Sequence, residues 1–74
     1  MKVGCPKESV AGEQRVAMTP DSVRQIQKLG YDCVVQSGAG DAAGFDDAAY
    51  EEAGAAVVKT AASLWKQADI VVKV

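Results

Sequence analysis

The feature that most constrains this chain is a regular alternation between short Val-rich runs and segments that open with a helix cap. The apolar runs cover Lys2–Cys5, Asp32–Gln36, Ala55–Val58 and Asp69–Val74. They are continuously apolar, which is typical of strands covered by helices on both faces. We therefore expect the order β-α-β-α-β-α-β and a parallel α/β sheet with right-handed crossovers.

The first segment between the runs has strong helix signals at both ends. Thr19 suits the N-cap position, and Pro20 suits the first helical position, where its missing N–H costs nothing. Gly30 suits the left-handed position that ends a helix. Between them, one apolar face recurs every three residues at Val23, Ile26 and Leu29.

Two further helices are expected from the same kind of signal. Asp46 caps a short helix that stops at Gly54, and Thr60 caps a third helix that runs to about Ala68. Two apolar pairs are placed to staple helix starts: Met18 with Val23, and Phe45 with Tyr50.

Size and charge exclude several classes of protein. Seventy-four residues make at most one domain with a thin core, while 49% hydrophobic residues are too many for a disordered tail. The net charge is -2 and the basic residues are scattered, which disfavours nucleic-acid binding. No apolar run approaches the roughly 20 residues of a membrane span, so no membrane insertion by this segment is expected. The N-terminus lacks the apolar stretch of a signal peptide.

The chain has two cysteines, Cys5 and Cys33, and no histidine. Two buried, reduced thiols are the expected state, and a disulfide stays open if their strands are neighbours. A zinc site needs more ligands than two isolated cysteines supply, so no metal site is expected. A catalytic triad that depends on histidine is excluded within these residues.

A glycine-containing loop follows the second strand. Its sequence from Gly38 to Ala43 fits the dinucleotide-binding pattern G-x-G-x-x-[GA]. Three observations argue against that function: the next helix is expected only at Asp46, Asp41 adds a negative charge, and Lys59-Thr60 stands where a ribose-binding carboxylate is needed. We therefore interpret the loop as a tight structural turn and keep nucleotide binding as the weaker alternative.

A polar loop, Lys7 to Arg15, follows the first strand, and ligands of open α/β sheets bind outside the carboxyl ends of strands. Arg15 is the candidate substrate-binding or cleft-lining residue, because the apolar stretch 16–18 would anchor it and a guanidinium can hold a carboxylate bidentately. The alternative is a surface arginine paired with Glu8 or Glu13. Lys73, with Glu8 as a partner, is given no catalytic role.

Five blocks occur in a familiar order: Val3–Glu8, Gly12–Pro20, Ser37–Gly40, Ala53–Ala55 and Ala68–Val74. Together they resemble the N-terminal domain shared by alanine dehydrogenase and the alpha subunit of proton-translocating NAD(P) transhydrogenase. The resemblance covers residues 1–74 and implies a Rossmann-like or flavodoxin-like parallel sheet, here cut after its fourth strand. The stretch from Phe45 to Tyr50, with the Pro6-Lys7-Glu8 start, is more similar to the transhydrogenase subunit.

The resemblance also implies where chemistry lies. Family members have two Rossmann-like domains facing across a cleft, and the dinucleotide binds mainly to the second, which is absent from residues 1–74. No cofactor is therefore expected on this chain alone, whereas the full enzyme uses NAD(H) and NADP(H). In alanine dehydrogenase an arginine at the position of Arg15 grips the substrate carboxylate. The family's substrate-binding lysine lies two positions past Lys73, and the dehydrogenase's catalytic histidine and aspartate lie further downstream.

Three functions follow as expectations. The first is an N-terminal fragment, inactive alone, of a transhydrogenase alpha subunit that passes hydride from NADH to NADP⁺ with proton translocation. Its partners would be the rest of that subunit, the beta subunit and other copies in a homo-oligomer, and its location would be cytoplasmic and peripheral to the inner membrane. The second is a fragment of alanine dehydrogenase, which interconverts pyruvate and L-alanine. The third is a non-enzymatic association module that pairs through an exposed sheet edge.

Overall fold

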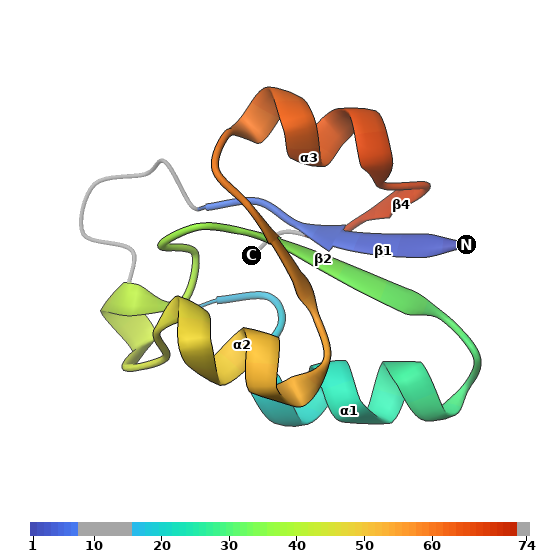
Figure 1. The fold of residues 1–74 in the computed structure, drawn as a ribbon, viewed down its shortest axis with the longest axis horizontal. Helices are drawn as coiled ribbons and strands as arrows, with labels where there is room; N and C mark the ends of the chain where they lie inside the picture. Colours follow the sequence, from blue (N-terminus) through green and yellow to red (C-terminus); the bar gives the residue numbers. More distant parts are fainter. Residues whose placement is uncertain (8–15, 73–74) are drawn as a thin grey trace.

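Parallel strands form one sheet in the computed structural model, which describes residues 1–7 and 16–72 (Figure 1). Within these residues the elements are, in chain order, β1 (Lys2–Cys5), α1 (Pro20–Lys28), β2 (Asp32–Gln36), a single 3₁₀ turn (Asp41–Ala43), α2 (Asp47–Ala53), β3 (Ala56–Val58), α3 (Ala61–Gln67) and β4 (Ile70–Val71). The predicted alternation of strands and helices and the parallel α/β class are confirmed.

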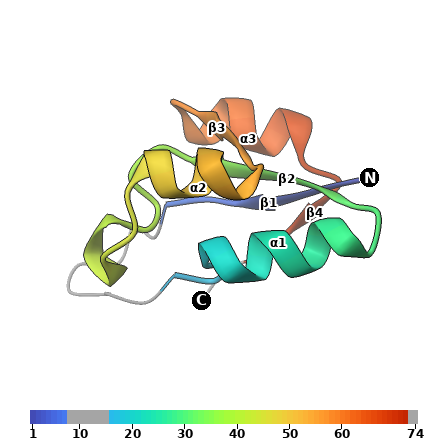
Figure 2. The same ribbon diagram turned by 60° about the horizontal axis from the view of Figure 1, so that its bottom comes forward.

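The strand order in the sheet is β3-β2-β1-β4, and every pairing is parallel. The first two crossovers therefore step outward from β1, and the third returns past β1 to its other side. Figures 1 and 2 show the consequence: α1 and α2 cover one face of the sheet, and α3 covers the other. The chain thus reverses its winding between β1 and β4, which is a topological switch point.

The larger part of the core lies between the sheet and the pair α1 and α2. Strand side chains that point to this face meet residues from the helices and their connections: Val3, Cys5, Met18, Val23, Cys33, Val35, Ala39, Tyr50, Ala53 and Ala55. On the other face Val34 and Leu64 are buried, with 1% and 0% of their surface exposed. Each fully buried Val or Leu side chain stabilises the fold by about 1.5–3 kcal/mol.

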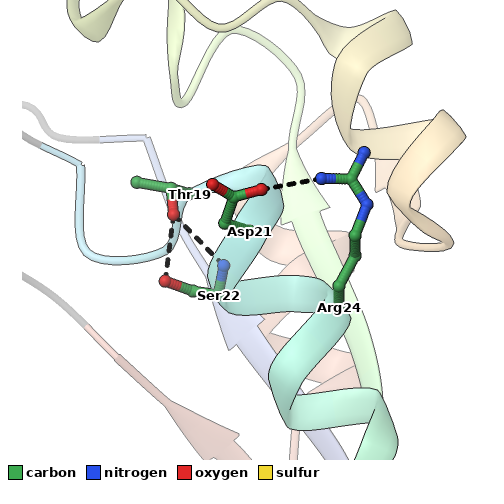
Figure 3. Close-up of polar contacts among 4 residues, drawn as sticks. All are labelled: Thr19, Asp21, Ser22 and Arg24. Carbon is green, nitrogen blue, oxygen red and sulfur yellow. Dashed lines mark hydrogen bonds and ion pairs between the residues drawn. The ribbon is translucent and has the colours of Figure 1, made fainter.

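The predicted helix caps are all present. The Thr19 hydroxyl accepts a hydrogen bond from the backbone N–H of Ser22 at 3.2 Å, and Asp21 pairs with Arg24 in the first turn of α1 (Figure 3). Two further caps repeat this arrangement: Asp46 accepts from Ala49 N at 2.9 Å, and Thr60 accepts from Ser63 N at 3.1 Å. Gly30 takes the expected left-handed conformation, with φ of +94°.

Two strands are shorter than the sequence predicted. β3 starts at Ala56, one residue later than predicted, because Ala55 N donates to the carbonyl of Tyr50 at 3.0 Å. That bond belongs to the turn that ends α2, so Ala55 N is not free to pair with a strand. β4 covers Ile70–Val71, inside the predicted Asp69–Val74, of which residues 73 and 74 lie outside the described part. At its start Asp69 N donates to the Lys2 carbonyl at 2.8 Å, as in a regular strand pair, whereas Lys2 N donates to the Asp69 carboxylate at 2.7 Å instead of to a backbone carbonyl.

Candidate functional site at the carboxyl edge of the sheet

The topological switch point predicts a ligand site beyond the carboxyl ends of β1 and β4. Ligands of open α/β sheets bind in the crevice formed there, because the loops after the two strands diverge to opposite faces. On the β1 side the described chain leaves the strand through Pro6 and Lys7, and it returns at Val16 to enter α1. The neighbouring end of β2 carries Gln36, followed by the glycine loop.

A short backbone segment, Gln36-Ser37-Gly38, connects three strand ends, and we call it the strand-end hub. The Gln36 side-chain oxygen Oε1 accepts a hydrogen bond from Lys7 N, just past β1, at 2.8 Å. Ser37 N donates to the carbonyl of Val58, the last residue of β3, at 2.7 Å. The hub therefore fixes the ends of β1, β2 and β3 relative to one another.

Asp47, in the first turn of α2, completes the hub from the side of the helix. Its Oδ1 accepts from Gly38 N at 2.9 Å, and its Oδ2 accepts from the Ser37 hydroxyl at 2.5 Å. The bond from Gly38, and then the bond from Ser37, lower the pKa of Asp47 against a smaller opposing effect of burial. The carboxylate is therefore charged at neutral pH. Through it, α2 is bonded to the two residues that follow β2, Ser37 and Gly38.

The glycine loop makes its close contacts with other parts of this chain, at Asp47 and Tyr50. Gly38 has φ of +83°, and its N–H, which a pyrophosphate would need, donates to Asp47. Gly40 has an ordinary φ of -99°, so the reason for glycine there is space: a Cβ would lie 2.5 Å from the Tyr50 hydroxyl. The sequence did not predict the 3₁₀ turn at Asp41–Ala43, whereas α2 begins after Asp46 as expected.

Arg15, the candidate substrate-binding residue, lies outside the described residues, as do Glu8, Glu13 and Lys73. The chain that follows Arg15 is firmly held. Met18 is 1% exposed, Val16 packs against the core, and the Met18 carbonyl accepts a hydrogen bond from the Tyr50 hydroxyl at 2.7 Å. Val16 and Met18 thus pack against the core as expected, and the anchoring of Arg15 by them stays a prediction.

Tyr50 is the buried polar group behind this edge of the sheet. Burial first, and then unfavourable electrostatic interactions of the phenolate with Cys5 and Asp41, raise the pKa of Tyr50 to about 12. The phenol therefore stays protonated at neutral pH and can donate to Met18. The Tyr50 and Phe45 rings also form a T-shaped pair, with ring centroids 6.4 Å apart, which confirms that predicted contact.

The two cysteines are free thiols on the same face of the sheet. Cys5 pairs with Val35 and Cys33 with Val3, so the two cysteines are offset by two residues on adjacent strands. Strand spacing and rise put their Cα atoms about 8 Å apart, too far for a disulfide. Burial raises the pKa of both thiols, opposed at Cys5 by the backbone of Met18 and Ala17 and reinforced at Cys33 by Asp32, so both stay protonated.

Within the described residues, no group of three or more His, Cys, Asp or Glu side chains could hold a metal ion. No helix in residues 1–7 and 16–72 is long and apolar enough to cross a membrane. The polar groups described above at the carboxyl edge are those of the strand-end hub, Lys7 and Asp47. Sequence reasoning missed Gln36 and Asp47, and the one available signal was a second Asp directly after the cap residue Asp46.

Comparison with known protein families shows the family of this chain. Residues 4–74 match the family model described as the alanine dehydrogenase/PNT N-terminal domain. The chain belongs to this family. Within the alanine dehydrogenase/PNT family, the chain is 60% identical over all 74 residues to the NAD(P) transhydrogenase subunit alpha of Cereibacter sphaeroides, of which it covers 14%. It is 45% identical over the same length to the alanine dehydrogenase of Halomonas elongata, of which it covers 20%.

Solved structures of the family have the same fold. An L-alanine dehydrogenase structure matches 99% of this chain with a TM-score of 0.92 and 41% identity. A crystal structure of transhydrogenase from Sinorhizobium meliloti matches 96% of the chain with a TM-score of 0.88 and 41% identity. The chain covers 20% and 21% of those two chains. The relatives are oxidoreductases, and the transhydrogenase resemblance is the stronger of the two in sequence.

Proposed function

We propose that this chain forms the opening part of a transhydrogenase alpha subunit, in which hydride passes from NADH to NADP⁺ with proton translocation. The observation that carries the proposal is the 60% identity to a transhydrogenase alpha subunit over the whole chain, against 45% for the alanine dehydrogenase of Halomonas elongata. Residues 1–74 would supply one wall of a cleft. The opposite wall, the nucleotide-binding domain, would come from chain beyond them.

The topological switch point between β1 and β4 supports this position of the cleft. In this proposal the dinucleotides NAD(H) and NADP(H) bind elsewhere in the full enzyme, and the 74 residues alone bind neither and are inactive. The supporting contact is the N–H of Gly38, which already donates to Asp47 at 2.9 Å. The partners would be the rest of the alpha subunit, the beta subunit and other copies of the parent. The domain would lie on the cytoplasmic side, peripheral to the membrane.

Arg15 is proposed as the residue of this wall that faces the cleft. The support comes from its neighbours, because Met18 and Tyr50 hold the chain three residues further on. In an alanine dehydrogenase this arginine would bind the keto-acid carboxylate bidentately. Alanine dehydrogenase remains the second candidate function, favoured by the TM-score of 0.92 with an L-alanine dehydrogenase structure.

The test uses the full-length protein, assayed for two reactions. Hydride transfer from NADH to an NADP⁺ analogue of distinct absorbance is expected, and NADH oxidation dependent on pyruvate and ammonium is not. The opposite pattern would select alanine dehydrogenase, and absence of both would reject the proposal.

Arg15→Ala is expected to lower the rate or the affinity while the melting temperature stays unchanged. The matched control is Arg24→Ala, which removes an exposed arginine that pairs with Asp21 on α1. Exposed pairs of this kind contribute at most about 1 kcal/mol. Equal activities of the two variants would place Arg15 outside the cleft.

A further inference from the structure

Gln36 is the last residue of β2, yet its side chain acts on the end of β1. Its Oε1 accepts from the backbone N–H of Lys7 at 2.8 Å. Pro6 has no N–H, so Lys7 carries the first backbone donor after β1. Gln36 therefore binds the chain at the first point where it leaves the strand.

The backbone that carries Gln36 is itself held from two other elements. Ser37 N donates to Val58 at the end of β3, and Asp47 of α2 binds both Ser37 and Gly38. The Lys7 side chain lies beside the same segment, with its Nζ 3.6 Å from the point that a Cβ on Gly38 would occupy. Lys7 is thus held through its backbone by Gln36, and its side chain lies beside Gly38.

We infer that Gln36 is a positioning residue of the cleft: through Lys7 it sets where the chain leaves β1 at the switch point. The inference rests on the proposed function, which places the substrate cleft at this edge, and it names a residue that orients one wall. Gln36 acts through Lys7 and does not itself react. A misplacement of about 1 Å in such a wall can lower catalytic efficiency by as much as about a hundredfold.

Three variants separate positioning from general stability. Gln36→Met keeps the length of the side chain and removes the acceptor, whereas Gln36→Glu keeps an acceptor for Lys7 N. The matched control is Gln27→Met: Gln27 Nε2 donates to the carbonyl of Gly54 at 2.7 Å, in the connection that precedes β3. Both Met variants lose one side-chain bond to backbone, but only Gln36 lies at the carboxyl edge.

The experiment measures two quantities in the full-length protein and the three variants. Amide hydrogen exchange at Lys7 should become about tenfold faster in Gln36→Met and stay unchanged in Gln36→Glu and Gln27→Met, because one hydrogen bond is lost only in the first. In the hydride-transfer assay, Gln36→Met should lower kcat about tenfold with little change in the KM for NADH, because the nucleotide binds the opposite wall and only the alignment of the cleft changes. Gln36→Glu should restore kcat.

Two results would overturn the inference. One is unchanged exchange at Lys7 in Gln36→Met. The other is a kcat that is unaffected by Gln36→Met, or that falls equally in Gln27→Met, which would reduce Gln36 to a structural residue. A wild-type protein that catalyses neither hydride transfer nor alanine dehydrogenation would reject the proposed function instead. In that case the inferred cleft is rejected as well. The rate of amide hydrogen exchange at Lys7 still reports whether Gln36 fixes the end of β1.

Discussion

The two faces of the sheet are packed in different ways. The face under α1 and α2 is filled by large buried side chains, above all Tyr50, Met18 and Val23. The face under α3 depends on close approach: Gly4 has no side chain, and a Cβ there would lie 2.5 Å from the Ala68 Cβ. The first face is therefore filled by large side chains, whereas the second combines the buried Val34 and Leu64 with a close backbone approach at Gly4. The candidate site is connected to the first face through Tyr50 and Asp47.

The largest expected effect comes from removing volume on the α1 and α2 face. Tyr50→Ala should lower the free energy of unfolding by about 4 kcal/mol, because it opens a cavity and leaves the Met18 carbonyl without its donor. The same truncation on the other face, Leu64→Ala, should cost about 3 kcal/mol. Urea denaturation of both variants checks the order, and a larger loss for Leu64→Ala would contradict the contrast between the faces.

Adding volume on the α3 face is the converse test. Gly4→Ala should cost about 2 kcal/mol, because its Cβ would overlap the Cβ of Ala68, whereas the Leu64 and Val34 side chains at 3.3 and 3.4 Å can adjust. Ala68→Gly removes the overlapping atom and should recover most of the loss in the double variant. A double-mutant cycle measures the coupling. Additive effects of the two substitutions would show that close approach does not define this face.

The fold could be predicted from the sequence wherever the signals are local. Thr19, Asp46 and Thr60 each cap a helix by accepting from the backbone N–H three residues further on. Both partners of each bond are close in the sequence, so the sequence alone predicts it. The Val-rich runs predicted all four described strands, because strands covered on both faces need continuous apolar residues. Strand ends were less predictable, since Asp69 bonds to Lys2 through a carboxylate across 67 residues of sequence.

The candidate site was only partly predictable, for the same physical reason. The glycine loop forms the expected tight turn, with Gly38 at positive φ, but no pattern indicated that Gly38 N would donate to Asp47. The bond between Lys7 and Gln36 joins residues 29 apart and exists only once the register of β1 and β2 is set. Arg15 stays a prediction, because it lies outside the described residues.

A smaller effect is expected from the Tyr50 hydroxyl alone. Tyr50→Phe keeps the ring and removes the donor to Met18, so it should cost about 1.5 kcal/mol at neutral pH. The pKa of Tyr50 is raised from 10.0 to about 12, so the stability linked to this group is present below pH 10 and is lost between pH 10 and 12. Wild type should therefore lose more stability than Tyr50→Phe over that range, as measured by urea midpoints. Parallel curves for the two proteins would contradict a buried phenol.

The smallest expected effect concerns Asp47, where the α1 and α2 face meets the candidate site. The pKa of Asp47 is lowered from 3.8 by Gly38 N and then by the Ser37 hydroxyl. A lowered pKa means that its stabilisation is present above pH 3.8 and is lost as the pH falls below that value. Because the group is partly exposed, the effect should stay below about 1 kcal/mol.

Asp47→Asn is the variant that measures this contribution. It should reduce stability at pH 7 and flatten the acid limb of the stability curve, because the amide does not titrate. Asp46→Asn is the matched substitution one residue earlier, where Asn is as good an N-cap as Asp and keeps the acceptor for Ala49 N. Urea midpoints at pH 7 and at pH 3 should therefore differ less in Asp47→Asn than in Asp46→Asn. Equal differences would mean that the charge of Asp47 contributes nothing at the strand-end hub, and that α2 is held to the sheet by its buried residues Tyr50 and Ala53.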